Sequence, residues 1–318
     1  MKNYNAKAII TLLLADDVSD DTKIKLLSEI QKYGNNIDIL YDLVKIIKKT
    51  QTISLSYPHS FDIVGTGWSL LPRFNTSTTC AFILSRAGIP VLKHWSNAST
   101  GRVGSFDLLE HMQYHIPQTI QEINHCIQNQ QPVFLYARLF FPLMKTVANA
   151  RKEYGKPTLF NILWPLLNPA DSWYQLIGCS FQDKMDMMIQ VCKKIWKKRV
   201  CVVRGDDGLD DVTVTTNTQV YMLNHNHITK HCIDPSFFGL RATNFDEITW
   251  GDTQYNTHIM QSILNGTCKT KHLDLVLANC ALALFIYHQS INLDHPDASK
   301  IIQWYVKDLR VLLHYIDN

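Results

Sequence analysis

The sequence has no closely paired cysteines. None of its eight cysteines belongs to a C-x-x-C pair; they are Cys80, Cys126, Cys179, Cys192, Cys201, Cys232, Cys268 and Cys280. Structural zinc sites and disulfide-rich scaffolds usually show such paired spacing. We therefore expect reduced thiols and a cytoplasmic location.

Long apolar runs and a strong net charge are also missing. The apolar stretch Ala8–Ala15 is too short to span a bilayer, and Asp16 and Asp17 follow it directly, which does not fit a secretory signal. The net charge of +3 gives no argument for a nucleic-acid partner. With 46% hydrophobic and 19% charged residues, the 318-residue chain can bury a sizeable core as two domains or one large one.

Three helices are predicted within residues 4–50. Apolar residues recur at helical spacing in Ala6–Leu14, Ile24–Ile30 and Ile39–Ile47. Ser19 is a suitable N-cap, and a turn is predicted at Gly34–Asn36.

Strands and helices alternate in the rest of the chain, which is typical of α/β proteins. Strands are predicted at Phe61–Val64, Pro90–Leu92, Pro132–Tyr136, Gln175–Cys179 and Arg199–Arg204, and as a pair around Thr216–Asn217 within Val212–Leu223. Helices are predicted at Ser77–Ala87, Leu108–Tyr114, Ile116–Asn129, Asp183–Lys197, Asp252–Leu264, His272–Tyr287 and Pro296–Tyr315. The cluster of His225, His227 and His231 is predicted to be a solvated loop between a strand and a helix, not a metal site.

The segment Phe61–Asp107 contains two glycine-bearing polar loops, each following a predicted strand. A strand, a glycine turn, a polar loop and a helix N-terminus in this order present several backbone N–H groups to one anion. Two such loops close together in the sequence indicate one extended, phosphate-rich ligand.

The same segment resembles the phosphoribosyl-diphosphate (PRPP) site of the anthranilate phosphoribosyltransferase family, which belongs to glycosyltransferase family 3. The family motif GTGGDxxxxFNxST aligns with Gly65–Thr78, and KHGNRxxSSxSGSAD aligns with Lys93–Asp107. Further motifs align in the same order: HPAMKxVAPVRRELG with Phe141–Gly155, TxFNxLGPLxNPA with Thr158–Ala170, and GxDGLDEIS with Gly205–Val212. The resemblance therefore covers nearly the whole chain.

The resemblance implies a fold and an assembly. The expected fold is α/β, with a small N-terminal helical domain and a larger domain whose central, mostly parallel sheet is flanked by helices. The helical domain is expected at residues 1–60, completed by a segment near 140–170, and the α/β domain at residues 61–318. In the family the helical domain packs against a partner subunit, which implies a homodimer; a helical cap with no interface role remains the alternative.

The resemblance also implies an activity: transfer of 5-phosphoribose from PRPP to anthranilate, with release of diphosphate, in tryptophan biosynthesis. Such a transfer needs positioning and electrostatic stabilisation but no covalent nucleophile, so no catalytic residue is assigned. The PRPP-binding residues implied are Gly65, Thr66, Gly67, Asn75, Ser77, Thr78, Lys93, Thr100 and Ser105. Ser77, Asp210 and Asp211 are implied as Mg²⁺ ligands, and Arg151 and Ser96 as contacts of the acceptor. Taken alone, paired aspartates are usually a solvated turn, and Arg151 a solvated helix face.

Several family positions are changed in this chain. An acid is replaced by Ser69, the phosphate-clamping arginine by Asn97, and a histidine by Phe141. Tryptophans stand at three loop positions where ligand is expected: Trp68, Trp95 and Trp164. Their indoles would either fill the pocket or stack on a flat ring. Arg73 either restores the lost positive charge or is a surface residue. The alternative function is therefore a non-catalytic family member that binds a ligand, a partner or single-stranded nucleic acid.

Overall fold

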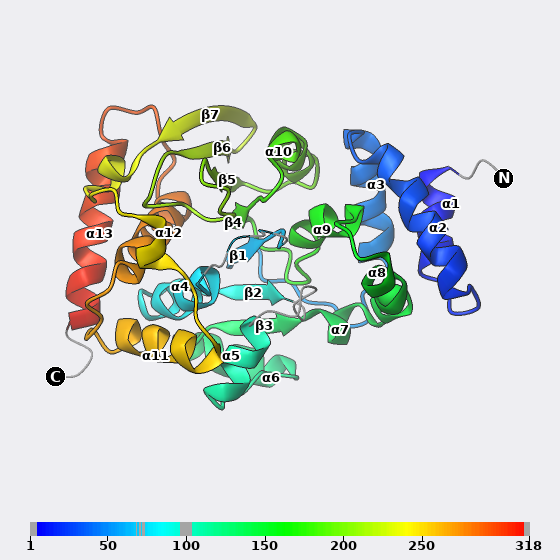
Figure 1. Ribbon diagram of the computed structural model, residues 1–318, viewed down its shortest axis with the longest axis horizontal. Helices are drawn as coiled ribbons and strands as arrows, with labels where there is room; N and C mark the ends of the chain where they lie inside the picture. The colour runs from blue at the N-terminus through cyan, green and yellow to red at the C-terminus, as the bar shows by residue number, and fades with distance from the viewer. Residues whose placement is uncertain (1–4, 68, 70, 72–73, 96–103, 315–318) are drawn as a thin grey trace.

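The structure is a computed structural model that describes residues 5–67, 69, 71, 74–95 and 104–314 (Figure 1). Three N-terminal helices lie at one end of its long axis: α1 (Ala6–Leu13), α2 (Asp20–Ile30) and α3 (Ile37–Lys48). They confirm the three predicted helices. Ser19 caps α2, since its hydroxyl accepts a hydrogen bond from the Thr22 backbone N–H at 3.4 Å.

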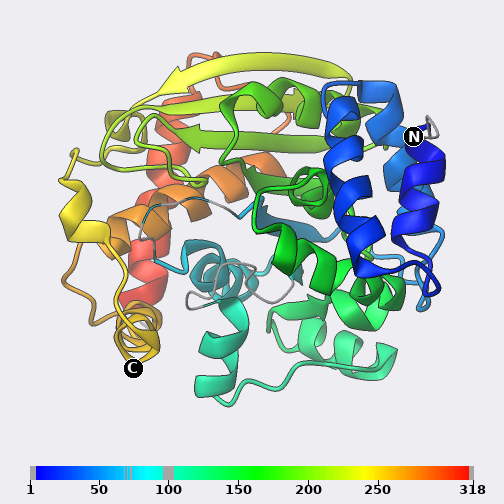
Figure 2. The same cartoon turned by 45° about the vertical axis from the view of Figure 1, so that its right-hand side comes forward.

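A later part of the chain packs against these helices, as both ribbon views show (Figures 1 and 2). It contains α7 (Ala137–Phe140), α8 (Ala148–Tyr154) and α9 (Leu159–Leu163). Lys23 of α2 donates to the Thr146 carbonyl at 2.7 Å, and Lys48 of α3 donates to the Asn168 carbonyl at 2.7 Å. One apolar cluster joins the two segments, so they form a common helical layer.

The central sheet has five strands in the order β1-β4-β5-β6-β7. Its strands are β1 (Phe61–Gly65), β4 (Tyr174–Gly178), β5 (Arg199–Gly205), β6 (Thr218–Asn224) and β7 (His227–Ile233). The first three strands are parallel, and β6 and β7 add antiparallel pairs. A separate parallel pair, β2 (Leu92–Trp95) and β3 (Val133–Tyr136), meets β1 through a bridge between Phe61 and Val91. The α/β class is as predicted, with a mixed sheet.

Helices cover both faces of the sheet (Figure 1). Along β5, Cys201 and Val203 belong to the apolar cluster that contains α12 (His272–His288), whereas Val200 and Val202 belong to the cluster that contains α3 and α10 (Met185–Lys194). Both sets of side chains are buried, as expected for parallel strands covered on two faces. The remaining helices are α4 (Thr76–Arg86), α5 (Ser105–His111), α6 (Ile120–Gln128), α11 (Thr253–Leu264) and α13 (Ala298–His314).

Two predictions about strands were wrong. The strand predicted at Pro90–Leu92 begins only at Leu92. The strand pair predicted within Val212–Leu223 is a single strand, β6, and its partner β7 contains two of the three clustered histidines. His225, with φ +54°, lies in the tight turn between them, so the cluster is a hairpin and not a loop before a helix.

The segment before β6 is held by side chains in place of a strand partner. Thr213 and Thr215 each donate a hydroxyl hydrogen bond to the Asp207 carboxylate at 2.5 Å. Such local side-chain hydrogen bonds compete with a sheet ladder. No helix within the described part of the chain has the length and apolar character needed to cross a membrane.

The ends of β1 and β4 approach the loop after β5 very closely. Thr66 N–H donates to the Gly178 carbonyl at 2.8 Å. A Cβ placed on Gly178 would lie 1.7 Å from the backbone oxygen of Asp210, so only glycine fits there. The position of the Asp210 loop therefore depends on Gly178.

We predict that Gly178→Ala lowers the free energy of unfolding by about 3 kcal/mol or more, because a backbone segment must move to admit the methyl group. Urea unfolding measures this loss. Gly67→Ala is the comparison: among the described residues, apart from its chain neighbours, no atom lies within 4 Å of its Cβ, and only the left-handed backbone (φ +66°) is strained, at a cost of about 1–2 kcal/mol. Equal losses in the two variants would contradict the close approach.

Candidate active site

The glycine turn after β1 is fixed against the segment that follows β4. The Ser180 backbone N–H donates to Thr66 Oγ1 at 2.9 Å, and the Ser180 hydroxyl donates to the Gly67 carbonyl at 2.7 Å. From α9, Asn161 Nδ2 approaches the Thr66 carbonyl at 3.5 Å. The predicted site residues Gly65, Thr66 and Gly67 therefore form a rigid turn at the carboxyl edge of the parallel strands, where α/β folds bind ligands.

The N-terminus of α4 lies beside this turn and has a buried cation beneath it. Lys93 of β2 is only 3% exposed. Its ammonium donates to the Ile63 carbonyl at 2.5 Å and to the Ser77 hydroxyl at 3.1 Å. A lysine at this place adds positive charge to the positive end of the α4 dipole. The hydrogen bond from Lys93 to Ser77 connects this buried charge to the first turn of α4.

Three more predicted residues meet near the start of α4. The Thr78 hydroxyl donates to the Ser105 hydroxyl, at the start of α5, at 2.8 Å. Asn256 of α11 donates to the Asn75 side-chain oxygen at 3.3 Å. Asn75, Thr78 and Ser105 are thus brought together by helices that lie far apart in the sequence.

Asp210 and Asp211 are both buried, at 1% and 7% exposure, in the loop after β5. Cys179 directly follows β4, and burial is the main reason that the pKa of its thiol is raised. The charge of Asp210 raises that pKa further. Cys80 lies one turn along α4 from Ser77. Burial and the neighbouring Cys280 raise the pKa of the Cys80 thiol, and the charge of Asp211 raises it further. The two carboxylates are therefore buried close to the thiols of Cys179 and Cys80, and they do not form a solvated turn.

These oxygen donors suit magnesium. Mg²⁺ is usually held by one or two carboxylates together with substrate phosphate oxygens and water. Within the described ranges, no group of three or more His, Cys, Asp or Glu side chains could hold a metal by itself. Asp210, Asp211 and the Ser77 hydroxyl therefore fit a metal that binds together with a phosphate ligand.

Arg151, a predicted acceptor contact, has no carboxylate beside it among the described residues. Arg151 of α8 is partly buried, and its guanidinium carbon lies 5.5 Å from the centre of the Phe160 ring. Burial lowers the pKa of Arg151 to about 10, so it keeps its charge at neutral pH. Among the described residues no ion pair neutralises it.

Aromatic rings pack around His94 of β2. The fully buried His94 stacks on Trp164 with ring centres 4.6 Å apart, and Phe141 lies edge-on to His94 at 6.1 Å. The ring nitrogens of His94 and the Trp164 indole N–H are buried, and no well-formed hydrogen bond reaches them from the described residues, although the Trp164 backbone lies close enough to His94 to oppose the lowering of its pKa. Burial, with Lys48 and Lys93 nearby, lowers the pKa of His94 to about 3.

Some predicted positions lie outside the described residues: Trp68, Arg73, Ser96, Asn97 and Thr100, together with the side chain of Trp95. Other residues at the site were missed by sequence reasoning. Ser180 and Asn161 both bond to the glycine turn. Asn161 is part of a matched motif, and Ser180 follows a predicted strand, so the motif and a search of strand ends would have found one each.

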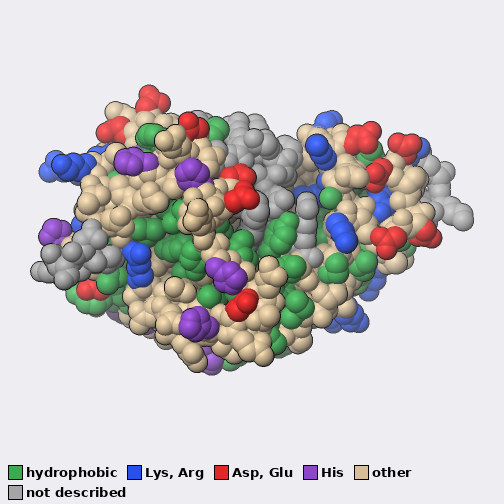
Figure 3. Space-filling model, turned by 90° about the horizontal axis from the view of Figure 1, so that it is seen from below, with side chains coloured by type: hydrophobic (Ala, Val, Ile, Leu, Met, Phe, Trp, Pro, Cys, Tyr) green, Lys and Arg blue, Asp and Glu red, His purple; other side chains and the backbone are tan. Residues whose placement is uncertain are grey.

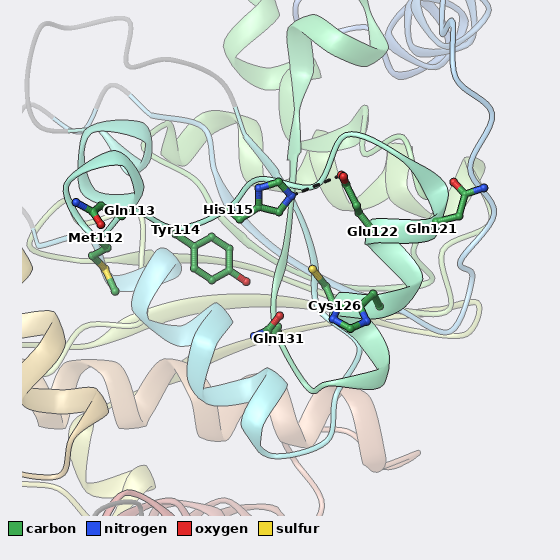
Figure 4. A pocket seen from close by; sticks show the side chains of 9 residues that line it. Met112, Gln113, Tyr114, His115, Gln121, Glu122, Cys126 and Gln131 are labelled. Carbon is green, nitrogen blue, oxygen red and sulfur yellow. Dashed lines mark ion pairs between the residues drawn. The ribbon is translucent and has the colours of Figure 1, made fainter.

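A separate pocket of about 590 Å³ lies on the outer side of α6 and shares no residue with this site (Figure 4). It is lined by His115 and Glu122, 3.6 Å apart, and by the apolar sides of Tyr114 and Cys126. Figure 3 views the molecule from the side of α5, α6 and α11 and shows histidine and hydrophobic side chains gathered there.

Comparisons with known proteins point in one direction. A family model described as "Glycosyl transferase family, a/b domain" matches residues 57–301. The chain is 32% identical over 280 residues to an anthranilate phosphoribosyltransferase of Alkaliphilus metalliredigens, covering 88% of this chain and 82% of the relative. It is 33% identical over 288 residues to one of Endomicrobium trichonymphae, covering 90% and 85%.

Solved structures share the fold. The anthranilate phosphoribosyltransferase of Thermus thermophilus superposes with a TM-score of 0.80 at 22% identity, covering 98% of this chain and 96% of the other. The Saccharomyces cerevisiae enzyme, solved in complex with PRPP and Mg, superposes with a TM-score of 0.77 at 23% identity, covering 98% and 90%.

The buried His94 predicts a pH-dependent stability. Its pKa falls from 6.5 when free to about 3 in the folded chain, so the unfolded chain takes up a proton that the folded chain does not. Its contribution is complete above pH 6.5 and is lost as the pH falls towards 3, at up to about 1.4 kcal/mol per pH unit.

His94→Phe keeps an aromatic ring and removes the proton site. Urea unfolding at pH 7, 5 and 4 should therefore show a shallower loss of stability in the variant than in the wild type. Parallel losses would mean that His94 is not a buried neutral imidazole.

Proposed function

Because this chain belongs to the anthranilate phosphoribosyltransferase family, we propose that it transfers the phosphoribosyl group of PRPP to anthranilate and releases diphosphate. The observation that carries this proposal is the meeting of the Gly65–Gly67 turn, the N-terminus of α4 and the Asp210–Asp211 loop at one edge of the sheet. A relative solved in complex with PRPP and Mg has the same fold.

The diphosphate is bound by backbone and hydroxyl donors. The N–H groups at the start of α4 and the hydroxyl of Ser77 face the anion, with the charge of Lys93 below them, while the buried Thr78 hydroxyl donates to Ser105. Asp210, Asp211 and Ser77 would hold Mg²⁺, which would supply positive charge to the diphosphate. The remaining predicted contacts, Ser105, Asn75 and Thr66, keep these donors in place.

No side chain needs to form a covalent bond during the transfer. The acceptor amine attacks the anomeric carbon as diphosphate leaves, and the protein lowers the barrier by positioning and by electrostatics. The planar guanidinium of Arg151 suits a two-point contact with the anthranilate carboxylate. Ser96 is proposed as a second acceptor contact.

The acceptor side is narrower than the family pattern implies. Trp164 stands where that pattern has glycine, and it is stacked on His94. We expect slow turnover of anthranilate for this reason. The alternative of a non-catalytic binding protein has less support, because the relatives named above are all phosphoribosyltransferases.

The assembly and the location also belong to this proposal. We propose that residues 1–60, together with a segment near 140–170, form a helical domain through which two copies pair, and that residues 61–318 form the α/β domain. The bonds of Lys23 and Lys48 to the later segment support that grouping. All eight cysteines are unpaired, which supports a reducing, cytoplasmic location.

The first test is isothermal titration of the protein with PRPP and Mg²⁺, followed by measurement of diphosphate release after anthranilate is added. We expect PRPP binding that requires the metal, and slow release that depends on anthranilate. Binding without release would support the non-catalytic alternative, and no heat at millimolar PRPP would defeat both the transferase and its PRPP site.

Arg151→Gln should raise the KM for anthranilate about tenfold to hundredfold and leave the KM for PRPP nearly unchanged, because one charged hydrogen-bonding contact of the acceptor is lost. Lys152→Gln is the matched control: this neighbour on α8 is exposed, and its loss should change neither value. Equal effects of the two variants would remove Arg151 from the acceptor site.

Trp164→Gly should increase kcat/KM for anthranilate, because removing the indole widens the acceptor side and frees His94 from its stack. Losing this partly buried aromatic ring costs less stability than the about 3–5 kcal/mol of a fully buried one, and the assay is run below the unfolding temperature of the variant. An unchanged or lower kcat/KM in a folded variant would show that Trp164 does not restrict the acceptor.

A further inference from the structure

The proposed site has two buried aspartates and binds a highly charged anion, yet the family's phosphate-clamping arginine is Asn97 in this chain. A second arginine stands at the end of the central sheet, where none of the motifs above assigned a role. Arg204 is the next-to-last residue of β5, directly before the loop that carries Asp210 and Asp211.

The direction of the Arg204 side chain follows from the alternation along the strand. Val200 and Val202 face the cluster shared with α3 and α10, and Arg204 falls on the same face. Its Nη1 donates to the Gly205 carbonyl at 3.2 Å, and its Nε lies 3.5 Å from the Ser180 carbonyl. The guanidinium therefore lies against the segment that fixes the Gly65–Gly67 turn.

Arg204 is also close to the loop of the two aspartates. A Cβ on Gly208 would lie 3.9 Å from Arg204 Nη2. Arg204 lowers the pKa of the Cys179 thiol while Asp210 raises it, against the larger effect of burial, so both charges act on the same point at the end of β4. The guanidinium thus stands between the glycine turn and the proposed metal ligands.

The hydrogen bonds of Arg204 do not neutralise it. Both acceptors are backbone carbonyls, and no ion pair of Arg204 occurs among the residues that the structure describes. A guanidinium has five N–H donors in a planar fork, and these two contacts leave donors on Nη1 and Nη2 for a ligand. A partly buried arginine with spare donors suits a phosphate, which it can bind at two points.

We propose that Arg204 binds the diphosphate group of PRPP and supplies the positive charge that is missing at Asn97. This inference rests on the proposed function, because it assigns a residue to the same anion. Together with Mg²⁺, Arg204 offsets the negative charges that the diphosphate, Asp210 and Asp211 bring to one edge of the sheet.

The test is isothermal titration of the full chain with inorganic diphosphate and with PRPP, each with Mg²⁺. Four proteins are compared: the wild type, Arg204→Gln, Arg204→Lys and Arg241→Gln. Arg241 is an exposed loop residue and controls for the loss of one positive charge. We expect Arg204→Gln to weaken both ligands about tenfold to hundredfold, the scale of a hydrogen bond to a charged group. Arg204→Lys should recover part of the affinity, and Arg241→Gln should bind as the wild type does.

The two possible failures are distinguishable. If the wild type binds PRPP and Arg204→Gln binds both ligands as Arg241→Gln does, the role of Arg204 is overturned and the proposed function stands. If the wild type binds neither ligand at millimolar concentration, the proposed function and this inference are both overturned. Circular dichroism checks folding, and should Arg204→Gln not fold, a wild-type affinity in folded Arg204→Lys would equally overturn the requirement for a planar fork.

Discussion

The site depends on the contact between the backbone of Gly178 and the carbonyl of Asp210, which leaves no room for a side chain. The same residue accepts the Thr66 N–H, so one glycine joins the turn after β1 to the loop after β5. Parallel pairing of β1, β4 and β5 brings the carboxyl ends of the three strands to one edge, and this contact then fixes their loops relative to one another. The proposed diphosphate donors and the proposed metal ligands are held at a constant separation because these loops cannot move independently.

A buried polar layer supports that edge from below. The Asp62 carboxylate accepts a hydrogen bond from the backbone N–H of His94 at 3.1 Å and another from the Gln175 side-chain amide at 2.8 Å. These bonds connect β1 to β2 and β4. Burial raises the pKa of Asp62, while the nearby Lys93 lowers it. Lys93 in turn holds Ser77. Buried polar groups of this kind are costly unless they are paired, so the layer fixes the positions of the strands as well as the electrostatics of the site.

The sequence was sufficient for the family and for most elements, because the order of the motifs is conserved along nearly the whole chain. It was insufficient where tertiary contacts decide. The residues before β6 alternate like a strand, but Thr213 and Thr215 bond to Asp207 and leave the sheet. The resemblance implied Lys93 as a PRPP-binding residue, and its 3% exposure depends on how β2 packs beneath α4. The stack of His94 on Trp164 joins residues seventy positions apart.

The PRPP half and the acceptor half of the site have diverged to different degrees. Around the glycine turn, Thr66 and Gly67 match the family pattern and are held by hydrogen bonds from Ser180, although Ser69 replaces an acid of that pattern. On the acceptor side, an indole and a phenyl ring surround a neutral histidine. The chain is therefore best understood as a PRPP-binding scaffold with an altered acceptor pocket.

The most direct measurement is a crystal structure of the protein soaked with PRPP and Mg²⁺. The account predicts diphosphate density between the start of α4 and the Asp210–Asp211 loop, with the metal against both carboxylates and the ribose directed towards Trp164. Density for the ligand at another place, or none at this edge at saturating PRPP, would contradict it.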